Sequence, residues 1–302
     1  MLIMLDFKPI TTDDFDVIKP YFDKAELSAG IVFMWRKHYN TSFAIANETL
    51  ITKSEYMGET LFSMPIGKDV PGALELMCRY ADENSIAPVI SFVTNAGLEL
   101  LDGLYEYAAT CERDLADYIY LAEDLAYMRG RKYSGQRGHI NAFIKSFPDF
   151  EFKDIDSTNI NDVKLFYADY LAKRGKTDES FLAEAEILPE IFDNPDLYGF
   201  TGLALYTEKG LVAFAMGEIV GDTLWEHIEK ADPSVRGAYQ MIASGFARCF
   251  ADKVKYVNRE DDAGDEGLRK SKLSYHPCHL LEKFSVTLIR RKTPVSMAKG
   301  TD

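Results

Sequence analysis

Hydrophobic and polar residues follow the same order twice along the chain. Three short stretches in each half alternate apolar with polar positions and predict antiparallel strands, namely 41–46, 50–53 and 60–66 in the first half and 203–206, 211–219 and 223–231 in the second. Turn residues such as Gly221 and Asp222 separate them. The sequence therefore predicts two copies of a strand meander.

Each meander leads into a helix with a matching start. The two starts read Val70-Pro-Gly-Ala-Leu74 and Val235-Arg-Gly-Ala-Tyr239, and a further apolar strand follows each helix, at 88–93 and at 254–258. The second helix carries an apolar stripe of the kind that packs on a sheet. We therefore expect an α/β protein with mixed sheets, made of two halves at 1–118 and 119–302.

Composition narrows the class of protein. The chain has 302 residues, of which 47% are hydrophobic, and no apolar run approaches the ~20 residues of a membrane span. The four cysteines are widely spaced and no secretion signal is visible, so we expect free thiols and a cytoplasmic location. A net charge of −14 argues against DNA and disfavours tRNA, because both need clustered Lys and Arg. A small-molecule ligand suits the local basic patches better.

The first basic patch lies in residues 119–150, which have no counterpart in the other half. It includes Gly130-Arg-Lys-Tyr-Ser-Gly-Gln-Arg137, and a helix that opens at Ser134 or Gly135 would present Arg137 and Asn141 on one face. We select Arg131, Lys132, Tyr133 and Arg137 as candidate substrate-binding residues. A basic linker helix with no ligand is the alternative.

The second patch, at 257–277, packs acids and bases together directly after a strand. Its candidate substrate-binding residues are Asn258, Arg259, Glu260, Asp261, Arg269 and Lys272. The corresponding stretch of the first half, 94–104, has no basic residue. We therefore expect the second half to carry the activity and the first to be a scaffold. A solvated, salt-bridged helix start is the alternative.

Together these motifs resemble a known family. Residues 130–137, Glu229-Lys-Ala-Asp232, 236–239 and 258–277 are similar to bacterial proteins grouped with the C-terminal catalytic domain of phosphatidylglycerol lysyltransferase. The resemblance covers nearly the whole chain and implies a tandem GNAT-type acyltransferase fold. Fem-type peptidoglycan aminoacyltransferases are more distant relatives.

The resemblance also implies where the donor binds. In GNAT folds the donor pyrophosphate lies where the helix after the fourth strand begins, at backbone N–H groups that favour an anion. The corresponding residues are Val235, Arg236, Gly237, Ala238 and Tyr239. We expect acyl-CoA or aminoacyl-tRNA as co-substrate and no tightly bound cofactor. A glycine that merely starts a tightly packed helix is the alternative.

Acyl transfer needs groups that move protons. Alternation along 223–231 predicts that Trp225, His227 and Glu229 share one face, with Glu229 as preferred base and His227 as second choice. Tyr275 is a candidate general acid. Each could instead be structural, Glu229 in an ion pair and Tyr275 as a packed ring. His276-Pro-Cys-His279 has no second ligand cluster, so we predict no metal site.

The resemblance implies an acyl- or aminoacyl-transferase, and we expect an amine or hydroxyl acceptor. No hydrolase elbow, phosphate loop of NTPases or dinucleotide fingerprint occurs in the sequence. The alternative is a non-catalytic ligand-binding module that retains the same fold.

Overall fold

The computed structural model describes residues 4–22, 27–174 and 179–292. The chain forms two compact units, each assembled from separate segments. Of the described residues, the first unit contains those within 4–9, 40–113 and 282–292, and the second contains those within 10–39 and 114–281.

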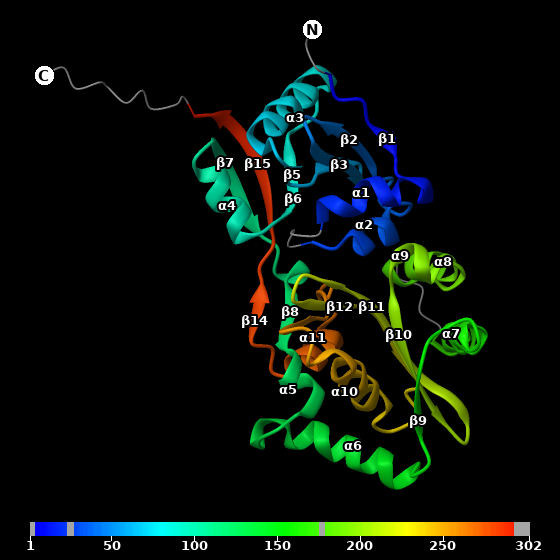
Figure 1. Cartoon of the computed structure of the whole chain (residues 1–302). Helices are drawn as coiled ribbons and strands as arrows, with labels where there is room; N and C mark the ends of the chain where they lie inside the picture. The colour runs from blue at the N-terminus through cyan, green and yellow to red at the C-terminus, as the bar shows by residue number, and fades with distance from the viewer. Residues whose placement is uncertain (1–3, 23–26, 175–178, 293–302) are drawn as a thin grey trace, which may run out of the picture. The chain divides into compact units, whose positions relative to one another are not determined.

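The first unit is built on one mixed sheet (Figure 1). In spatial order its strands are β1 (Lys8–Pro9), β2 (Ser42–Ala46), β3 (Thr49–Tyr56), β4 (Glu59–Phe62), β6 (Val89–Val93), β15 (Phe284–Arg291) and β7 (Tyr105–Cys111), with β5 (Ile66–Gly67) paired to β3. Helix α3 (Val70–Asn84) connects β4 to β6, which are parallel, and α4 (Asn95–Asp102) connects β6 to β7. Phe62, Leu74 and Ile90 lie in its core.

The second unit has a seven-stranded mixed sheet. In spatial order its strands are β14 (His279–Leu281), β8 (Asp117–Leu121), β13 (Tyr256–Asn258), β12 (Thr223–Ala231), β11 (Gly210–Val220), β10 (Thr201–Thr207) and β9 (Glu151–Asp154). Its helices are α1 (Phe15–Phe22), α2 (Ala29–Trp35), α5 (Ala122–Tyr127), α6 (Ser134–Ser146), α7 (Ile160–Arg174), α8 (Glu179–Asp193), α9 (Pro195–Tyr198), α10 (Ala238–Phe250) and α11 (Glu266–Leu273).

Helices cover both faces of this sheet because successive side chains of a strand point to opposite sides. On β11, Ala213 and Ala215 are buried in the core cluster that includes α10. Between them, Phe214 meets the rings of Phe166 on α7 and Phe192 on α8. Helix α10 therefore lies on one face, and α7 and α8 lie on the other (Figure 1).

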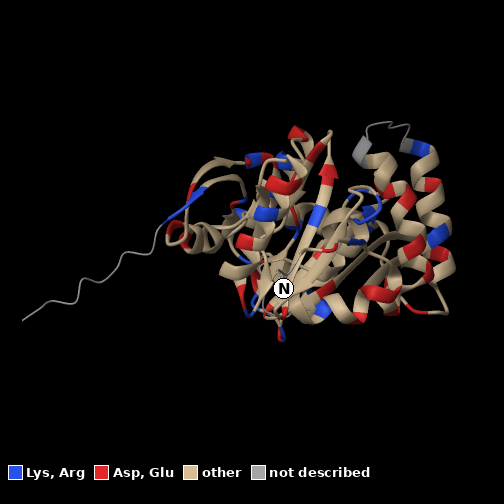
Figure 2. Ribbon diagram, turned by 90° about the horizontal axis from the view of Figure 1, so that it is seen from above, with Lys and Arg blue, Asp and Glu red and all other residues tan. Residues whose placement is uncertain are grey.

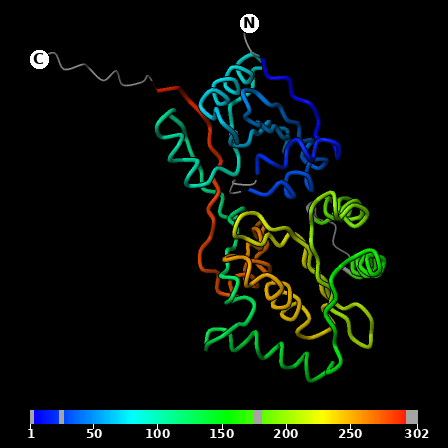
Figure 3. Tube along the Cα trace, viewed as in Figure 1, coloured from blue at the N-terminus to red at the C-terminus, as the bar shows by residue number. Residues whose placement is uncertain are grey.

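One strand of the first sheet comes from the end of the sequence. β8 follows the first-unit strand β7 in sequence but pairs with β13 and β14 of the second sheet. The C-terminal strand β15 pairs with β6 and β7 of the first sheet, where Figure 3 shows its red trace beside them. The first sheet is therefore completed by a strand from the end of the sequence.

Residues 10–39 also belong with the second unit. Arg36 at the end of α2 is buried, donates to the hydroxyl of Tyr198 at 3.0 Å and pairs with Glu190 on α8. The two units are therefore not contiguous in sequence, unlike the expected halves 1–118 and 119–302.

The predicted elements are present. Both meanders form, as β2 to β4 and β10 to β12, and the mixed α/β architecture is confirmed. Helix α6 opens at Ser134, as expected. Helix α10 begins at Ala238, three residues after the start that the sequence suggested.

Three further properties correspond to features considered in the sequence. In the described part of the chain, no helix is long and apolar enough to cross a membrane. Lys and Arg are interspersed with Asp and Glu along the ribbons (Figure 2). The four cysteines are free thiols.

Candidate functional site

The candidate site centres on the place where β12 and β13 separate. The two strands are parallel and pair only through Thr223–Trp225 and Tyr256–Asn258. Helix α10 connects them, so the chain leaves β12 at Ala231 and returns through β13. Side chains from β12 and from the segment after β13 occupy the space beyond the last paired residues.

A β-bulge breaks the alternation of β12. Met216 pairs with Ile228 but its neighbour Gly217 pairs with Glu226, which leaves His227 as the extra residue. A Cβ atom at Gly217 would lie 1.9 Å from the carbonyl oxygen of Trp225, so only glycine permits this close approach.

Because of this bulge, His227 and Glu229 lie on different faces of the sheet, although they were predicted to share one. His227 lies with the rings of Trp225 and Phe200, at centroid distances of 6.4 and 4.8 Å. Glu229 contacts Arg259 together with Glu226 on the opposite face. The expectation that His227 and Glu229 point to the same side was wrong, because one extra residue shifts the alternation between them.

Arg259 is held between two carboxylates. Its Nε donates to Glu226 Oε1 at 2.8 Å and its Nη2 donates to Glu229 Oε2 at 2.6 Å. The guanidinium also stacks near the rings of Tyr120 and Tyr275, at 5.8 and 4.9 Å from their centroids. Arg259 is only 8% exposed, so this is an ion-pair cluster away from solvent.

One guanidinium cannot balance two buried carboxylates. Burial raises the pKa of Glu229 well above its usual value, and the nearby Glu226 raises it further against the opposing effect of Arg259. The raised pKa makes Glu229 the carboxyl group of this cluster that most readily holds a proton. Glu229 is therefore a candidate proton donor as well as the base that the sequence suggested.

His227 forms a separate buried network on the other face. Its Nδ1 donates to Glu260 Oε1 at 2.6 Å, and its Nε2 lies 3.3 Å from Glu218 Oε1 and 3.4 Å from Ser28 Oγ. Ser28 also donates to Glu218, and the backbone N–H of Gly30 donates to the same carboxylate at 2.9 Å. An imidazole between two carboxylates is stabilised as a cation.

This network predicts a pH-dependent stability. Burial alone would lower the pKa of His227, but hydrogen bonds and charge from Glu218 and Glu260 outweigh it and raise the pKa to about 9. The stabilisation is complete below the unfolded pKa of about 6.5 and is lost as pH rises through about 9. It amounts to about 3 kcal/mol, at about 1.4 kcal/mol per tenfold change in proton affinity.

The measurement is the free energy of unfolding between pH 6 and 10 for the wild type and for His227→Gln. The wild type should lose its advantage over the variant as pH rises. Parallel curves would show that His227 is not a buried cation.

The charge-rich segment 258–264 is fixed by its own contacts. Lys272 donates its ammonium group to the backbone carbonyls of Arg259, Glu260 and Asp261, and Asn258 donates to Asp117 Oδ2 at 2.9 Å. Glu260 adopts a left-handed φ of 56°. Lys272 and Asn258, predicted to bind substrate, are thus engaged in holding this loop.

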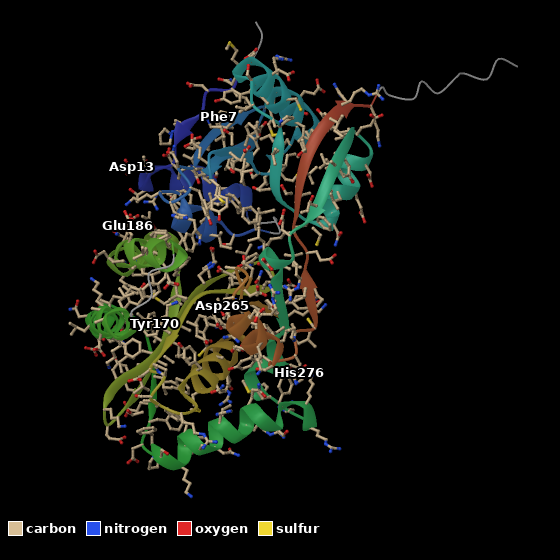
Figure 4. All side chains as sticks on the ribbon, turned by 180° about the vertical axis from the view of Figure 1, so that it is seen from behind. Phe7, Asp13, Tyr170, Glu186, Asp265 and His276 are labelled. Atoms are coloured by element: carbon tan, nitrogen blue, oxygen red, sulfur yellow. The ribbon has the colours of Figure 1, made fainter. Side chains whose placement is uncertain are left out.

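Arg269 and Asp261 also make contacts that hold the segment 258–264 in place. Arg269 donates to Asp262 and to Asp114, both at 2.6 Å through Nη2. Asp261 accepts from the backbone N–H of Ala263 at 3.0 Å. Figure 4 shows the surroundings, with Asp265 labelled at the start of α11 and His276 after its end.

The residues predicted around 130–137 also make internal contacts. Arg137 donates to the carbonyls of Met128 and Gly130, and the ring of Tyr133 is fully buried. Lys132 pairs with Asp124 at 3.0 Å. Arg131 is exposed and, among the described residues, has no ionic partner.

The start of α10 is organised differently. Gly237 precedes the helix with φ 86°, and a Cβ there would lie 2.3 Å from the carbonyl oxygen of His139. Val235 and Ala238 are buried, Tyr239 is half-buried, and Arg236 is exposed with no hydrogen bond or ion pair to any described residue. Among the five residues predicted to bind the donor at the start of α10, Arg236 is the cation, and its side chain makes no polar contact with a described residue.

Tyr275 lies beside Arg259 and is 3% exposed. Burial raises the pKa of its hydroxyl, so the group is neutral at physiological pH. His276 faces the ring of Tyr133, and its Nε2 lies 2.9 Å from the carbonyl oxygen of Lys132. Within the described ranges, no three His, Cys, Asp or Glu side chains are grouped as metal ligands.

Glu226, Glu218 and Ser28 were not predicted from the sequence. Regular alternation without a bulge would place Glu226 on the face opposite Glu229. Glu218 faces His227 across the β11–β12 pair, and Ser28 caps α2 by accepting from Ile31 N–H at 3.2 Å. A Gly within a strand, here Gly217, is the sequence signal that indicates a bulge.

Comparison with solved structures gives relatives of the whole chain. A conserved protein of unknown function from Bacteroides thetaiotaomicron is 33% identical, with a TM-score of 0.88 over 95% of this chain and 100% of that one. The C-terminal domain of a putative lysylphosphatidylglycerol synthetase from Agrobacterium fabrum is 11% identical, with a TM-score of 0.67 over 92% of each chain. L-PGS from Bacillus licheniformis is 14% identical, with a TM-score of 0.63 over 98% and 97%.

The last two likenesses concern the fold alone, and they confirm the tandem GNAT-type fold that the resemblance implied. The family model for the C-terminal part of phosphatidylglycerol lysyltransferase matches residues 21–287. With most of its length matched, the chain belongs to the family of the phosphatidylglycerol lysyltransferase C-terminal domain.

Proposed function

We propose that this chain is a transferase that moves an acyl or aminoacyl group from a CoA-type or aminoacyl-tRNA donor to an amine or hydroxyl acceptor. The donor phosphates bind at the start of α10, at Val235, Arg236, Gly237, Ala238 and Tyr239. The observation that carries this proposal is the exposed, unpaired Arg236 beside the first turn of a helix between two parallel strands.

Anion binding at this place follows from helix electrostatics. The first backbone N–H groups of a helix lack intrahelical partners, and the aligned peptide dipoles favour negative charge there. Gly237 lets the backbone turn tightly against His139, and α10 has 13 residues. Arg236 adds a cation whose planar fork suits phosphate oxygens.

The side chains beside Arg259 are the candidates for proton transfer. Glu229, whose pKa is raised by burial, lies toward the end of β12 that leads to α10. Acyl transfer to an amine also releases a leaving group that must be protonated. Glu229 and Tyr275, both beside Arg259, are the candidate proton donors, while the cationic His227 keeps an electrostatic role on the opposite face.

The two donor classes differ in the surface they need. A net charge of −14 and the internal pairing of Lys132, Arg137 and Arg269 support a small donor over a charged tRNA. Both donors are made in the cytoplasm, where we place the protein, and its free thiols fit that compartment.

Removing the Arg236 side chain tests the donor site. We expect Arg236→Ala to weaken donor binding about tenfold or more, because a charge-assisted hydrogen bond contributes about 1.5–3 kcal/mol. The dissociation constants of acetyl-CoA and of a total aminoacyl-tRNA pool are measured with wild type and variant. Thermal stability should stay the same, since the side chain is exposed.

Arg79→Ala is the matched control, because Arg79 is a partly exposed arginine on α3 of the first unit. Equal affinity of wild type and Arg236→Ala for every donor that binds would remove Arg236 from the site. A donor that binds without transfer to any of a broad panel of amines and alcohols would favour the second candidate, a non-catalytic ligand-binding module.

A further inference from the structure

A cavity of about 250 Å³ lies within the second unit, on the face of the sheet opposite Arg259. Its walls are Lys19 and Phe22 of α1, Ala29 of α2, Glu218 of β11 and residues 219–221. It is smaller than the roughly 300–1,000 Å³ of drug-sized sites, so it suits a ligand of small-metabolite size. Neither the α10 donor site nor the Arg259 cluster contributes to its lining.

Glu218 supplies a buried negative charge to this cavity. The residue is 4% exposed, and its hydrogen bonds from Ser28, Gly30 and His227 all end at one oxygen, Oε1. Within the described residues its other oxygen, Oε2, has no partner. Burial alone would raise the pKa of Glu218, but these hydrogen bonds and the charge of His227 lower it, so the carboxylate is ionised.

Lys19 supplies the opposite charge. The residue is half-buried, and its ammonium group lies 5.2 Å from the centroid of the Phe15 ring. A Cβ at Gly199 would lie 2.8 Å from this ammonium, so the glycine leaves it room. Lys19 forms no ion pair with Glu218 or with another described residue, although both line the same small cavity.

We propose that this cavity binds a zwitterion of the α-amino-acid type, with its ammonium group at Glu218 Oε2 and its carboxylate at Lys19. Glu218 and Lys19 carry opposite charges and line the same cavity without pairing with each other. A ligand with one ammonium and one carboxylate group can pair with both of them. A simple amine or a simple acid satisfies only one of them and leaves the other charge desolvated. This site does not depend on the identity of the donor at α10.

The test is calorimetric titration of the full chain with free L-amino acids, one at a time. We expect at least one amino acid to bind, and its amide and its N-acetyl derivative, which each lack one charge, to bind about tenfold or more weakly. If no amino acid binds at concentrations up to about 10 mM, or if an amide or N-acetyl derivative binds equally well, the proposal is wrong.

Variants locate the bound ligand. Lys19→Met should weaken binding of the amino acid about tenfold or more, whereas Lys19→Arg should largely restore it. Lys145→Met, at an exposed position of α6, is the matched control and should bind as the wild type does. Unchanged affinity of Lys19→Met would overturn the assignment. Because Glu218→Gln also removes contacts to Ser28 and His227, the conclusion rests on the Lys19 variants.

Failure here is distinguishable from failure of the proposed function. Loss of donor binding in Arg236→Ala with normal amino-acid binding would leave this cavity intact. Amino-acid binding that Arg236→Ala weakens as strongly as Lys19→Met does would place the ligand at α10 and contradict the cavity site.

Discussion

Replacing Arg259 with methionine is expected to destabilise the protein by about 3–5 kcal/mol. The substitution keeps an unbranched apolar stem but leaves Glu226 and Glu229 buried without their counter-charge. It also removes the stacking of the guanidinium on Tyr120 and Tyr275. The free energy of unfolding, from denaturant titration at pH 7, measures the effect.

Neutralising the two carboxylates provides the control for this prediction. In a Glu226→Gln/Glu229→Gln background, the same Arg259→Met change should cost less than half as much, because no unpaired charge remains. Equal costs in both backgrounds would mean that packing alone explains the role of Arg259. A cost below about 1 kcal/mol in the wild type would contradict the ion-pair cluster.

Lys272→Met is expected to cost about 2–4 kcal/mol. The ammonium group of Lys272 donates to three consecutive backbone carbonyls, and methionine leaves these acceptors without that partner. The carbonyls belong to Arg259, Glu260 and Asp261, so the loop that carries Arg259 should also loosen. Unfolding free energy and the hydrogen exchange of residues 258–264 measure the two effects.

Helix α11 contains its own control, since Lys270 is exposed while Lys272 is buried. Lys270→Met should change stability by less than about 0.5 kcal/mol. Similar losses for the two variants would show that the contacts of Lys272 with the loop contribute nothing specific.

Much of the fold could be predicted from periodicity. Strand alternation and the apolar stripe of α10 depend on local sequence, so both meanders and the sheet-packed helices were identified. The place of β15 could not be predicted, because its partners β6 and β7 lie far from it in the sequence. Pairing partners far apart in sequence depend on tertiary packing, which alternation does not encode.

At the candidate site, too, alternation along the sequence did not predict which side chains lie together. A single bulged residue, His227, placed Glu229 on the face opposite to the one expected and brought Glu226 beside it. The predicted importance of Arg259 and Glu260 agrees with their burial or contacts, but their roles in binding substrate stay predictions.

The charge-rich segment at 257–277 illustrates why composition misleads. Its charged side chains were predicted to face a substrate, whereas Lys272 and Arg269 bind the loop itself. The solvated helix start, the alternative considered for this segment, describes the exposed Lys270 but not the buried Lys272. Sequence alone could not separate Lys270 from Lys272, because two lysines two residues apart in a short helix differ mainly in the side they face.

The most direct test of the proposed donor site is hydrogen–deuterium exchange at the start of α10. Amides of residues 236–241 are followed with acetyl-CoA, with aminoacyl-tRNA and with deacylated tRNA, and in the Arg236→Ala variant. We predict that the donor slows exchange of these amides at least several-fold in the wild type and much less in the variant. Suppose that a donor binds and its acyl or aminoacyl group is transferred, while these amides exchange as fast as in the free protein. That result would contradict donor binding at α10.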